Sequence, residues 1–178
     1  MLIEEPYRHE FGVGAFPEEM YREMLKNLPE QSEYNVYQAY PRRYLYKSDS
    51  GFWREVFDYL AKPWVGYKFK SQLLRDLPGY EIGPHTDTYK KLKTYLYYLT
   101  DKEVEGAGTA IFKPKLHGFT SKTGTHYDFD AFEQVGTAPY VPNGFFAFER
   151  TDNSFHGVRK TDIIRNVIQL SIYKQGEY

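Results

Sequence analysis

The chain of 178 residues carries 23 Lys and Arg against 24 Asp and Glu, so its formal net charge at pH 7 is -1. A near-neutral chain gives no general electrostatic reason to bind nucleic acid or an anionic membrane. The absence of Cys excludes disulfides, thiolate metal sites and Cys nucleophiles, which leaves His and carboxylates to hold any transition metal. The length suits one domain, residues 1–178, with a single core.

The first residues, MLIEEPYRHEFGVG, are acidic and interrupted by Pro and Gly, unlike the basic and apolar regions of a signal peptide. No apolar run approaches the length that spans a membrane. We therefore expect a cytoplasmic protein without a membrane segment. Aromatic residues make up 19% of the chain, which suits strands and could also line a carbohydrate or peptide groove.

Residues 1–65 are predicted to form a helical support. A first short helix begins at Pro17 and ends before Pro29, with apolar residues at helical spacing at Met20, Met24, Leu25 and Leu28. A second helix of similar length carries Phe52, Val56, Phe57 and Leu60, with Asp49 or Ser50 as its N-cap and Pro63 just beyond its end. Both amphipathic helices need a sheet to cover.

From residue 66 onward the pattern changes to short β-rich segments separated by turn residues. The predicted strands are Tyr67–Leu74, Tyr80–Pro84, Lys93–Leu99, Thr109–Phe112, Gln134–Val141, Phe145–Phe148, Phe155–Val158 and Ile163–Tyr173. Strands without intervening helical periods indicate an antiparallel sandwich or barrel. We expect a mainly β jelly-roll core over residues 66–178, supported by the N-terminal helices.

The strongest local feature is the segment Tyr80–Asp87, which reads as a strand that ends in His85 and Asp87. Residues two apart on a strand point to the same face, so these two side chains could bind one ion from one side. His156 begins a short strand after a polar turn and could add a second imidazole. Two imidazoles and one carboxylate suit iron(II) in oxygenases, and zinc can use the same ligands.

The other histidines are His9, His117 and His126. They lie in apparently irregular segments, and none has a second potential ligand at a spacing that would indicate a metal site. Arg165 follows His156 by nine residues and begins an apolar strand. A guanidinium in such a strand is costly to desolvate unless a carboxylate pairs with it. The carboxylate could belong to a ligand or to a neighbouring Asp or Glu.

Over roughly Leu73 to Tyr173 the chain resembles the iron(II)/2-oxoglutarate-dependent dioxygenases, and within them the prolyl 4-hydroxylase-like branch. The ordered matches are His85-Thr86-Asp87, the Tyr-Leu strand Thr94–Leu99, the Gly-rich turn Gly106–Phe112, the Pro142-Asn143-Gly144 turn, His156-Gly157-Val158 and Arg165. The family's Gly-Gly-x-Thr turn is Gly-Ala-Gly-Thr here, and residues between Phe112 and Gln134 have no match. The substrate is therefore not carried over.

The resemblance implies a double-stranded β-helix with the site inside its mouth. It assigns His85, Asp87 and His156 to Fe(II), and Arg165 and Tyr98 to the distal carboxylate of the cosubstrate 2-oxoglutarate. O2 would then be consumed, with release of succinate and CO2. Asp87 stands where halogenating relatives have a small residue, which favours hydroxylation or a related oxidation.

Two alternatives stay open at the level of sequence. A non-catalytic β-sandwich that binds carbohydrate would explain the tyrosines, and a cupin-like metalloenzyme would keep the metal without 2-oxoglutarate. The substrate could be a peptide side chain, a sugar or a small metabolite, and the oligomeric state is open. Residues 117–132 form the longest irregular stretch, which could be a substrate lid or a solvated insertion.

Overall fold

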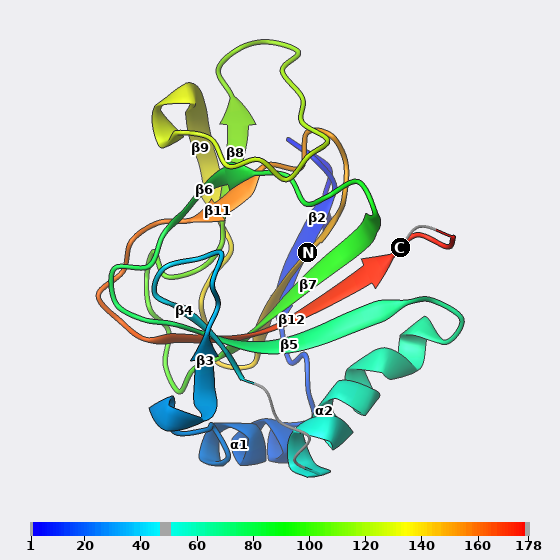
Figure 1. The fold of residues 1–178 in the computed structure, drawn as a ribbon, viewed down its shortest axis with the longest axis vertical. Helices are drawn as coiled ribbons and strands as arrows, with labels where there is room; N and C mark the ends of the chain where they lie inside the picture. Colours follow the sequence, from blue (N-terminus) through cyan, green and yellow to red (C-terminus); the bar gives the residue numbers. More distant parts are fainter. Residues whose placement is uncertain (1, 47–50, 177–178) are drawn as a thin grey trace.

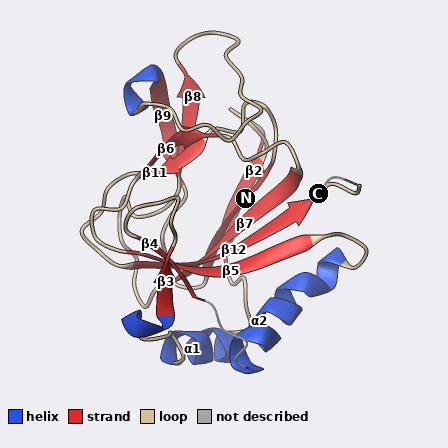
Figure 2. Ribbon diagram, in the orientation of Figure 1, coloured by secondary structure: helices blue, strands red, loops and turns tan. Residues whose placement is uncertain are grey.

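The computed structural model describes residues 2–46 and 51–176, which form two antiparallel sheets (Figures 1 and 2). The large sheet has the strand order β1-β2-β10-β7-β12-β5-β4-β3. Its strands are β1 Leu2–Ile3, β2 His9–Val13, β3 Tyr34–Val36, β4 Arg43–Tyr46, β5 Phe69–Asp76, β7 Lys91–Leu99, β10 Gly144–Glu149 and β12 Arg165–Tyr173. The small sheet, in the order β6-β11-β8-β9, comprises β6 Ile82–His85, β8 Ala110–Pro114, β9 Phe132–Thr137 and β11 His156–Val158.

From β5 to β12 the chain passes back and forth between the two sheets. Strands β5, β7, β10 and β12 form the middle of the large sheet, while β6, β8, β9 and β11 form the small one. This exchange is the double-stranded β-helix, so the predicted jelly roll is confirmed. All eight predicted strands are present, with ends displaced by a few residues, as expected where apolar patterns fade into turns.

The N-terminal part differs from the helical support that the sequence predicted. It contains helices α1, Glu18–Lys26, and α2, Gly51–Ala61, but also the four strands β1 to β4. These strands are two to five residues long, too short to show a clear alternation. They are fixed by partners distant in sequence, since β2 pairs with β10 and β4 pairs with β5. The proposed N-caps Asp49 and Ser50 lie outside the described residues.

Both helices lie along the outer face of the large sheet (Figure 1). α1 follows Pro17 directly and ends three residues before Pro29. Its buried side chains, with those of α2, pack on the outward residues of the central strands: Tyr21, Met24, Trp53, Val56 and Leu60 against Leu73, Tyr97, Leu99, Ile168, Leu170 and Ile172. Since this packing covers one face of the sheet, the opposite face is left to line the space between the sheets.

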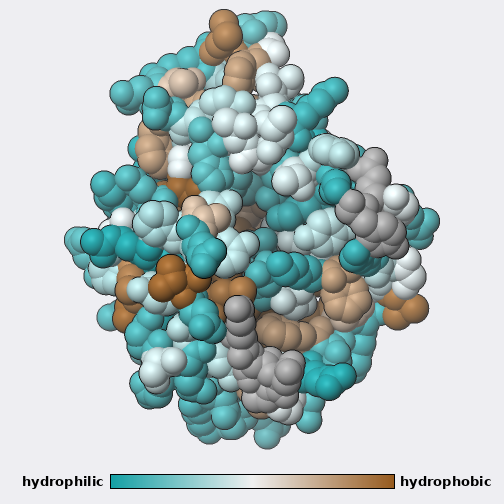
Figure 3. Space-filling view, in the orientation of Figure 1, coloured by the Kyte–Doolittle hydropathy of each residue, from teal (hydrophilic) through white to brown (hydrophobic). Residues whose placement is uncertain are grey.

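The face of the molecule in Figure 3 is mainly hydrophilic, with small separate hydrophobic areas. Over the described ranges, no helix has the length and apolar character needed to cross a bilayer. The inward face of the large sheet carries polar as well as apolar residues, including Gln72, Thr94, Arg165 and Gln169. A polar side chain buried inside a sandwich destabilises the folded state unless it is paired or binds a ligand. A functional site is therefore expected between the two sheets.

Candidate metal centre and adjoining cavity

His85 and His156 lie side by side on two neighbouring strands of the small sheet. They are directly opposite in the antiparallel pairing of β6 and β11, and their ring centroids are 4.4 Å apart. Asp87 lies two residues beyond the end of β6. One potential ligand atom from each of the three side chains lies within 4.8 Å of the others. The structure therefore brings together the three residues that the sequence singled out.

Backbone carbonyls orient both imidazoles. The Nδ1 atom of His85 is 2.9 Å from the carbonyl oxygen of Gly83, and the Nδ1 atom of His156 is 3.0 Å from that of Ser154. A carbonyl can only accept, so the proton of each neutral ring lies on Nδ1, which leaves the lone pair of Nε2 free for a metal. Burial lowers the pKa of both histidines below the usual value, so each ring is neutral at pH 7.

Asp87 is present as a carboxylate beside these rings. Burial by itself raises the pKa of Asp87, but Lys91, the two histidines and the hydrogen bond from Thr94 together outweigh burial and hold this pKa well below its usual range. Lys91 Nζ donates to Oδ1 at 2.9 Å, and the hydroxyl of Thr94 donates to Oδ2 at 2.6 Å. Lys91 thus supplies the positive charge beside Asp87 that a bound cation would supply.

Two glycines allow the chain to pass closely around the histidines. A Cβ atom at Gly83 would lie 2.3 Å from the carbonyl oxygen of Tyr127, and one at Gly157 would lie 2.6 Å from that of Ile82. Both distances are shorter than real Cβ contacts, so any side chain there would push β6, β11 or the 117–132 segment apart. The Gly in His156-Gly157-Val158 therefore has a steric role next to a candidate ligand.

The donor set fits a divalent iron ion. Two neutral imidazoles and an ionised carboxylate arranged on one side of a cavity leave the opposite coordination positions open. The same three ligands can also bind zinc. The geometry therefore supports a metal centre, while the identity of the metal depends on the rest of the cavity.

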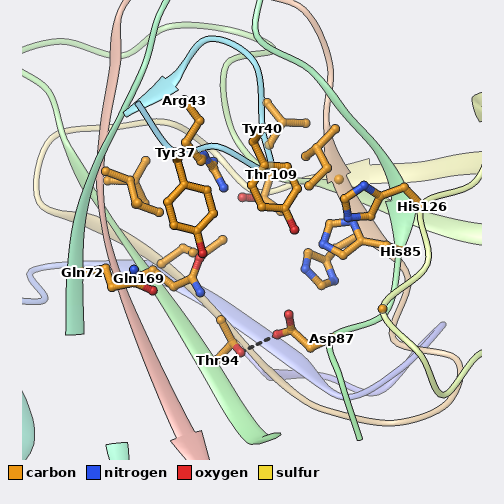
Figure 4. A pocket seen from close by; sticks show the side chains of 18 of the residues that line it. Tyr37, Tyr40, Arg43, Gln72, His85, Asp87, Thr94, Thr109, His126 and Gln169 are labelled. Carbon is orange, nitrogen blue, oxygen red and sulfur yellow. Dashed lines mark hydrogen bonds between the residues drawn. The ribbon is translucent and has the colours of Figure 1, made fainter. Parts of the chain in front are cut away.

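A cavity of about 190 Å³ extends from the candidate metal centre across the inner face of the large sheet (Figure 4). Its lining includes His85, Asp87, His156, Lys91, Thr94, Thr109, Arg165, Arg43, Gln72 and Gln169. Arg165 lies at the start of β12, and the following inward residues of this strand, Val167 and Gln169, continue the same wall. The predicted basic residue therefore shares a cavity with the predicted metal ligands.

Arg165 already has a carboxylate partner within the protein. Its Nη1 atom is 2.8 Å from Oδ2 of Asp76, and its Nε donates to the carbonyl oxygen of Ala107. The guanidinium of Arg43 also binds Asp76 in a two-bond contact, at 2.6 and 2.9 Å. Two guanidiniums thus share one carboxylate, so this buried cluster has a net charge of +1 on the wall of the cavity.

Tyr98 is fully buried on the inward side of β7. Its hydroxyl donates to Oγ1 of Thr109 at 2.9 Å, and it is Thr109 that lines the cavity. Burial raises the pKa of Tyr98, so it is a neutral hydrogen-bond donor at any physiological pH. The role of Tyr98 as a direct anchor for a carboxylate stays a prediction, since Thr109 lies between it and the cavity.

Residues 117–132 pack on the site and include a short 3₁₀ helix, Phe129–Ala131. Phe119 and Tyr127 contact the core phenylalanine Phe155, which directly precedes His156. The carbonyl oxygen of Ser121 accepts bonds from Thr86 and Arg150. These contacts anchor the stretch to the jelly roll, although most of its residues are exposed. Whether it is a substrate lid or a solvated insertion stays a prediction.

Several residues of the cavity were not predicted from the sequence. His126 had no partner in sequence, yet its ring lies 4.6 Å from that of His85 and 5.4 Å from that of Tyr40. Arg43, Tyr37 and Tyr40 come from the N-terminal part that was predicted to be helical. The place of Gln169 on the cavity wall could have been predicted, because the alternation on a strand puts it on the same face as Arg165. Gln72 is directly opposite it on β5. His9 is buried in β2 and His117 is exposed, both apart from the metal group.

No family model matches the sequence, and no curated protein matches it either. Solved structures do match its fold. A Pseudomonas putida prolyl-4-hydroxylase has a TM-score of 0.65 at 11% identity, with 94% of this chain and 92% of that chain covered. A Trichoplax adhaerens prolyl hydroxylase, in complex with a peptide fragment of the hypoxia inducible factor oxygen degradation domain, has a TM-score of 0.64 at 13% identity over 95% and 84% of the chains.

HygX from Streptomyces hygroscopicus, with nickel and 2-oxoglutarate bound, has a TM-score of 0.59 at 13% identity over 96% and 85% of the chains. At these identities the likeness concerns the arrangement of the backbone. It agrees with the exchange of strands between the two sheets. This chain has the double-stranded β-helix fold of the prolyl hydroxylases and of 2-oxoglutarate-binding proteins such as HygX.

Proposed function

We propose that the protein is an Fe(II)- and 2-oxoglutarate-dependent oxygenase that hydroxylates its substrate. The observation that carries the proposal is the meeting of His85, Asp87 and His156 at one end of a cavity whose wall also holds Arg165. Bound iron and 2-oxoglutarate supply the oxidising chemistry with O2. The protein holds them in place and limits access of water to the cavity.

The net positive charge of the Arg43–Asp76–Arg165 cluster supports an anionic cosubstrate. A buried excess cation is costly without an anion nearby, and this one faces a cavity. The distal carboxylate of 2-oxoglutarate would meet this charge while its other end meets the metal. Arg165, Arg43 and Thr109, with Tyr98 behind Thr109, are the groups that would orient it.

The test is formation of succinate from 2-oxoglutarate by the protein with Fe(II), ascorbate and O2. Many enzymes of this type turn over slowly without a substrate, so we expect a low rate that is abolished in Asp87→Ala and His156→Ala. His117→Ala is the matched control, because His117 is exposed and apart from the metal group. Absence of succinate, together with absence of 2-oxoglutarate binding to the Mn(II)-loaded protein, would overturn the proposal.

One observation favours a second candidate, a metalloenzyme of the same fold that uses no 2-oxo acid. Asp76 already pairs with Arg165, so this guanidinium has an anionic partner even when no 2-oxo acid is bound. The two candidates differ in one measurement. An enzyme of the second kind binds Mn(II) with full affinity and shows no heat of binding when 2-oxoglutarate is added to the loaded protein.

A further inference from the structure

Two glutamines on the inner face of the large sheet have no role in the proposed metal or cosubstrate sites. Gln72 on β5 and Gln169 on β12 are directly opposite each other in the antiparallel pairing, and both line the cavity. Gln72 is only 9% exposed. A buried amide on a cavity wall is expected to have hydrogen-bond partners.

The hydrogen bonds of this pair are incomplete. The Nε2 atom of Gln72 is buried and has no partner among the described residues. Gln169 uses its Nε2 to donate to Oγ of Ser171 at 3.2 Å, and within residues 2–46 and 51–176 nothing donates to its Oε1 atom. One free donor and one free acceptor therefore remain on neighbouring strands.

The glutamine wall is electrically neutral. The three cations that line the cavity belong to other parts of its wall, where Arg43 and Arg165 pair with Asp76 and leave one positive charge in excess, and Lys91 pairs with Asp87. Figure 4 shows the two glutamines on the side of the cavity away from His85, with the ring of Tyr37 reaching towards them. A ligand group at this wall meets amides and a phenol rather than a charge.

We infer that the pair formed by Gln72 and Gln169 is a substrate-recognition subsite that binds a neutral carboxamide. An amide carbonyl accepts from Nε2 of Gln72 while the amide N–H donates to Oε1 of Gln169, which satisfies both free groups at once. The cavity of about 190 Å³ is smaller than a typical ligand pocket of about 300–1,000 Å³. Only the part of the substrate that carries the carboxamide therefore enters the cavity. The inference deepens the proposed oxygenase function and rests on it.

The experiment uses protein loaded with Mn(II) and 2-oxoglutarate without oxygen, because Mn(II) enhances the relaxation of protons bound near it. The probes are acetamide and acetone, which have similar shapes and differ in that only the amide can donate, with tert-butanol as the hydroxyl probe. We expect a larger paramagnetic relaxation enhancement for the methyl protons of acetamide than for those of acetone or tert-butanol. In Gln72→Leu and Gln169→Leu the acetamide effect falls about two- to tenfold, as loss of one hydrogen bond predicts.

Gln175→Leu is the control, since Gln175 is exposed near the end of the described chain. Thermal melting and the affinities for Mn(II) and 2-oxoglutarate are measured for every variant. Equal enhancement by acetamide and acetone in the wild type overturns the subsite. A tenfold or greater loss of 2-oxoglutarate affinity in either glutamine variant also overturns it, since the pair then belongs to the cosubstrate. Failure of the wild type to bind Mn(II) or 2-oxoglutarate rejects the proposed function and the subsite with it.

Discussion

Asp76 and Arg165 are directly opposite each other on β5 and β12, and their side chains form a buried ion pair at 2.8 Å. Asp76 also pairs with Arg43, which is opposite it on β4. Three neighbouring strands thus place two guanidiniums around one carboxylate at the base of the sandwich. Because one positive charge remains in excess, the cluster can hold an anion without giving up its internal ion pairs.

Arg165 tests the cosubstrate most directly. Arg165→Met removes a buried charged partner, which typically costs about 3–5 kcal/mol, or roughly two to four decades in 2-oxoglutarate affinity. Arg165→Lys retains the charge without the planar fork and is expected to lose less. The measurement is calorimetric titration of 2-oxoglutarate into oxygen-free, Mn(II)-loaded protein. Wild-type affinity in a folded Arg165→Met variant would mean that the cosubstrate is held elsewhere or is not used.

Tyr98 is expected to have a smaller and indirect effect on the same titration. Tyr98→Phe removes one hydroxyl and leaves Thr109 without its donor, which costs about 1–3 kcal/mol at a buried position. Thr109→Val removes the acceptor at the cavity wall and should weaken 2-oxoglutarate binding by a similar factor. If the two variants act through one hydrogen bond, the double variant loses little more than either single variant. Additive losses would show that Tyr98 acts on the cosubstrate independently.

Asp76 is expected to be essential for stability as well as for the cavity. Asp76→Asn leaves the guanidiniums of Arg43 and Arg165 without their buried anion, which costs about 3–5 kcal/mol. The free energy of unfolding is measured by urea denaturation, with Asp58→Asn on the exposed side of α2 as the control. Because 2-oxoglutarate can replace the lost negative charge, it should raise the melting temperature of Asp76→Asn more than that of the wild type. An unfolding free energy equal to that of the control would contradict this account.

We expect the three candidate metal ligands and their neighbour His126 to differ clearly in their effect on Mn(II) binding. We expect His85→Ala, Asp87→Ala and His156→Ala each to weaken Mn(II) binding by at least about 100-fold, the upper range for loss of an outer-shell partner. His126→Ala should stay close to wild type, although its ring is 4.6 Å from that of His85. Electron paramagnetic resonance of free Mn(II) measures all four. A large loss of Mn(II) affinity in His126→Ala would show that His126 is a third imidazole ligand of the metal.

Alkaline pH should destabilise the fold through buried tyrosines. Burial raises the pKa of Tyr34 and of Tyr140 to about 12, whereas an unfolded tyrosine titrates near 10. The folded state therefore keeps these protons between pH 10 and 12 while the unfolded chain loses them, so stability is full below pH 10 and falls as pH rises to 12. Urea midpoints at pH 9, 10 and 11 measure the fall. Tyrosinate absorbance that titrates alike in native and unfolded protein would show that burial has no such effect.

Local patterns in the sequence determined the core of this fold. Alternation and turn residues located the strands from β5 to β12, because a half-buried strand between turns has a signature within its own few residues. The His85-Thr86-Asp87 spacing placed a His and a carboxylate on one side of a chain segment. The proximity of the three candidate ligands was predictable for this reason, since two of them are local and the third begins a recognisable strand.

The tertiary structure decided which distant residues meet in the cavity. The β4 strand has four residues and no pattern of its own, so only its pairing with β5 brings Arg43 to Asp76. The carboxylate partner of Arg165 was open in the sequence because several Asp and Glu residues could reach it, and the register of β5 against β12 selects Asp76. Registers between strands depend on the whole set of packed faces, which no single segment encodes.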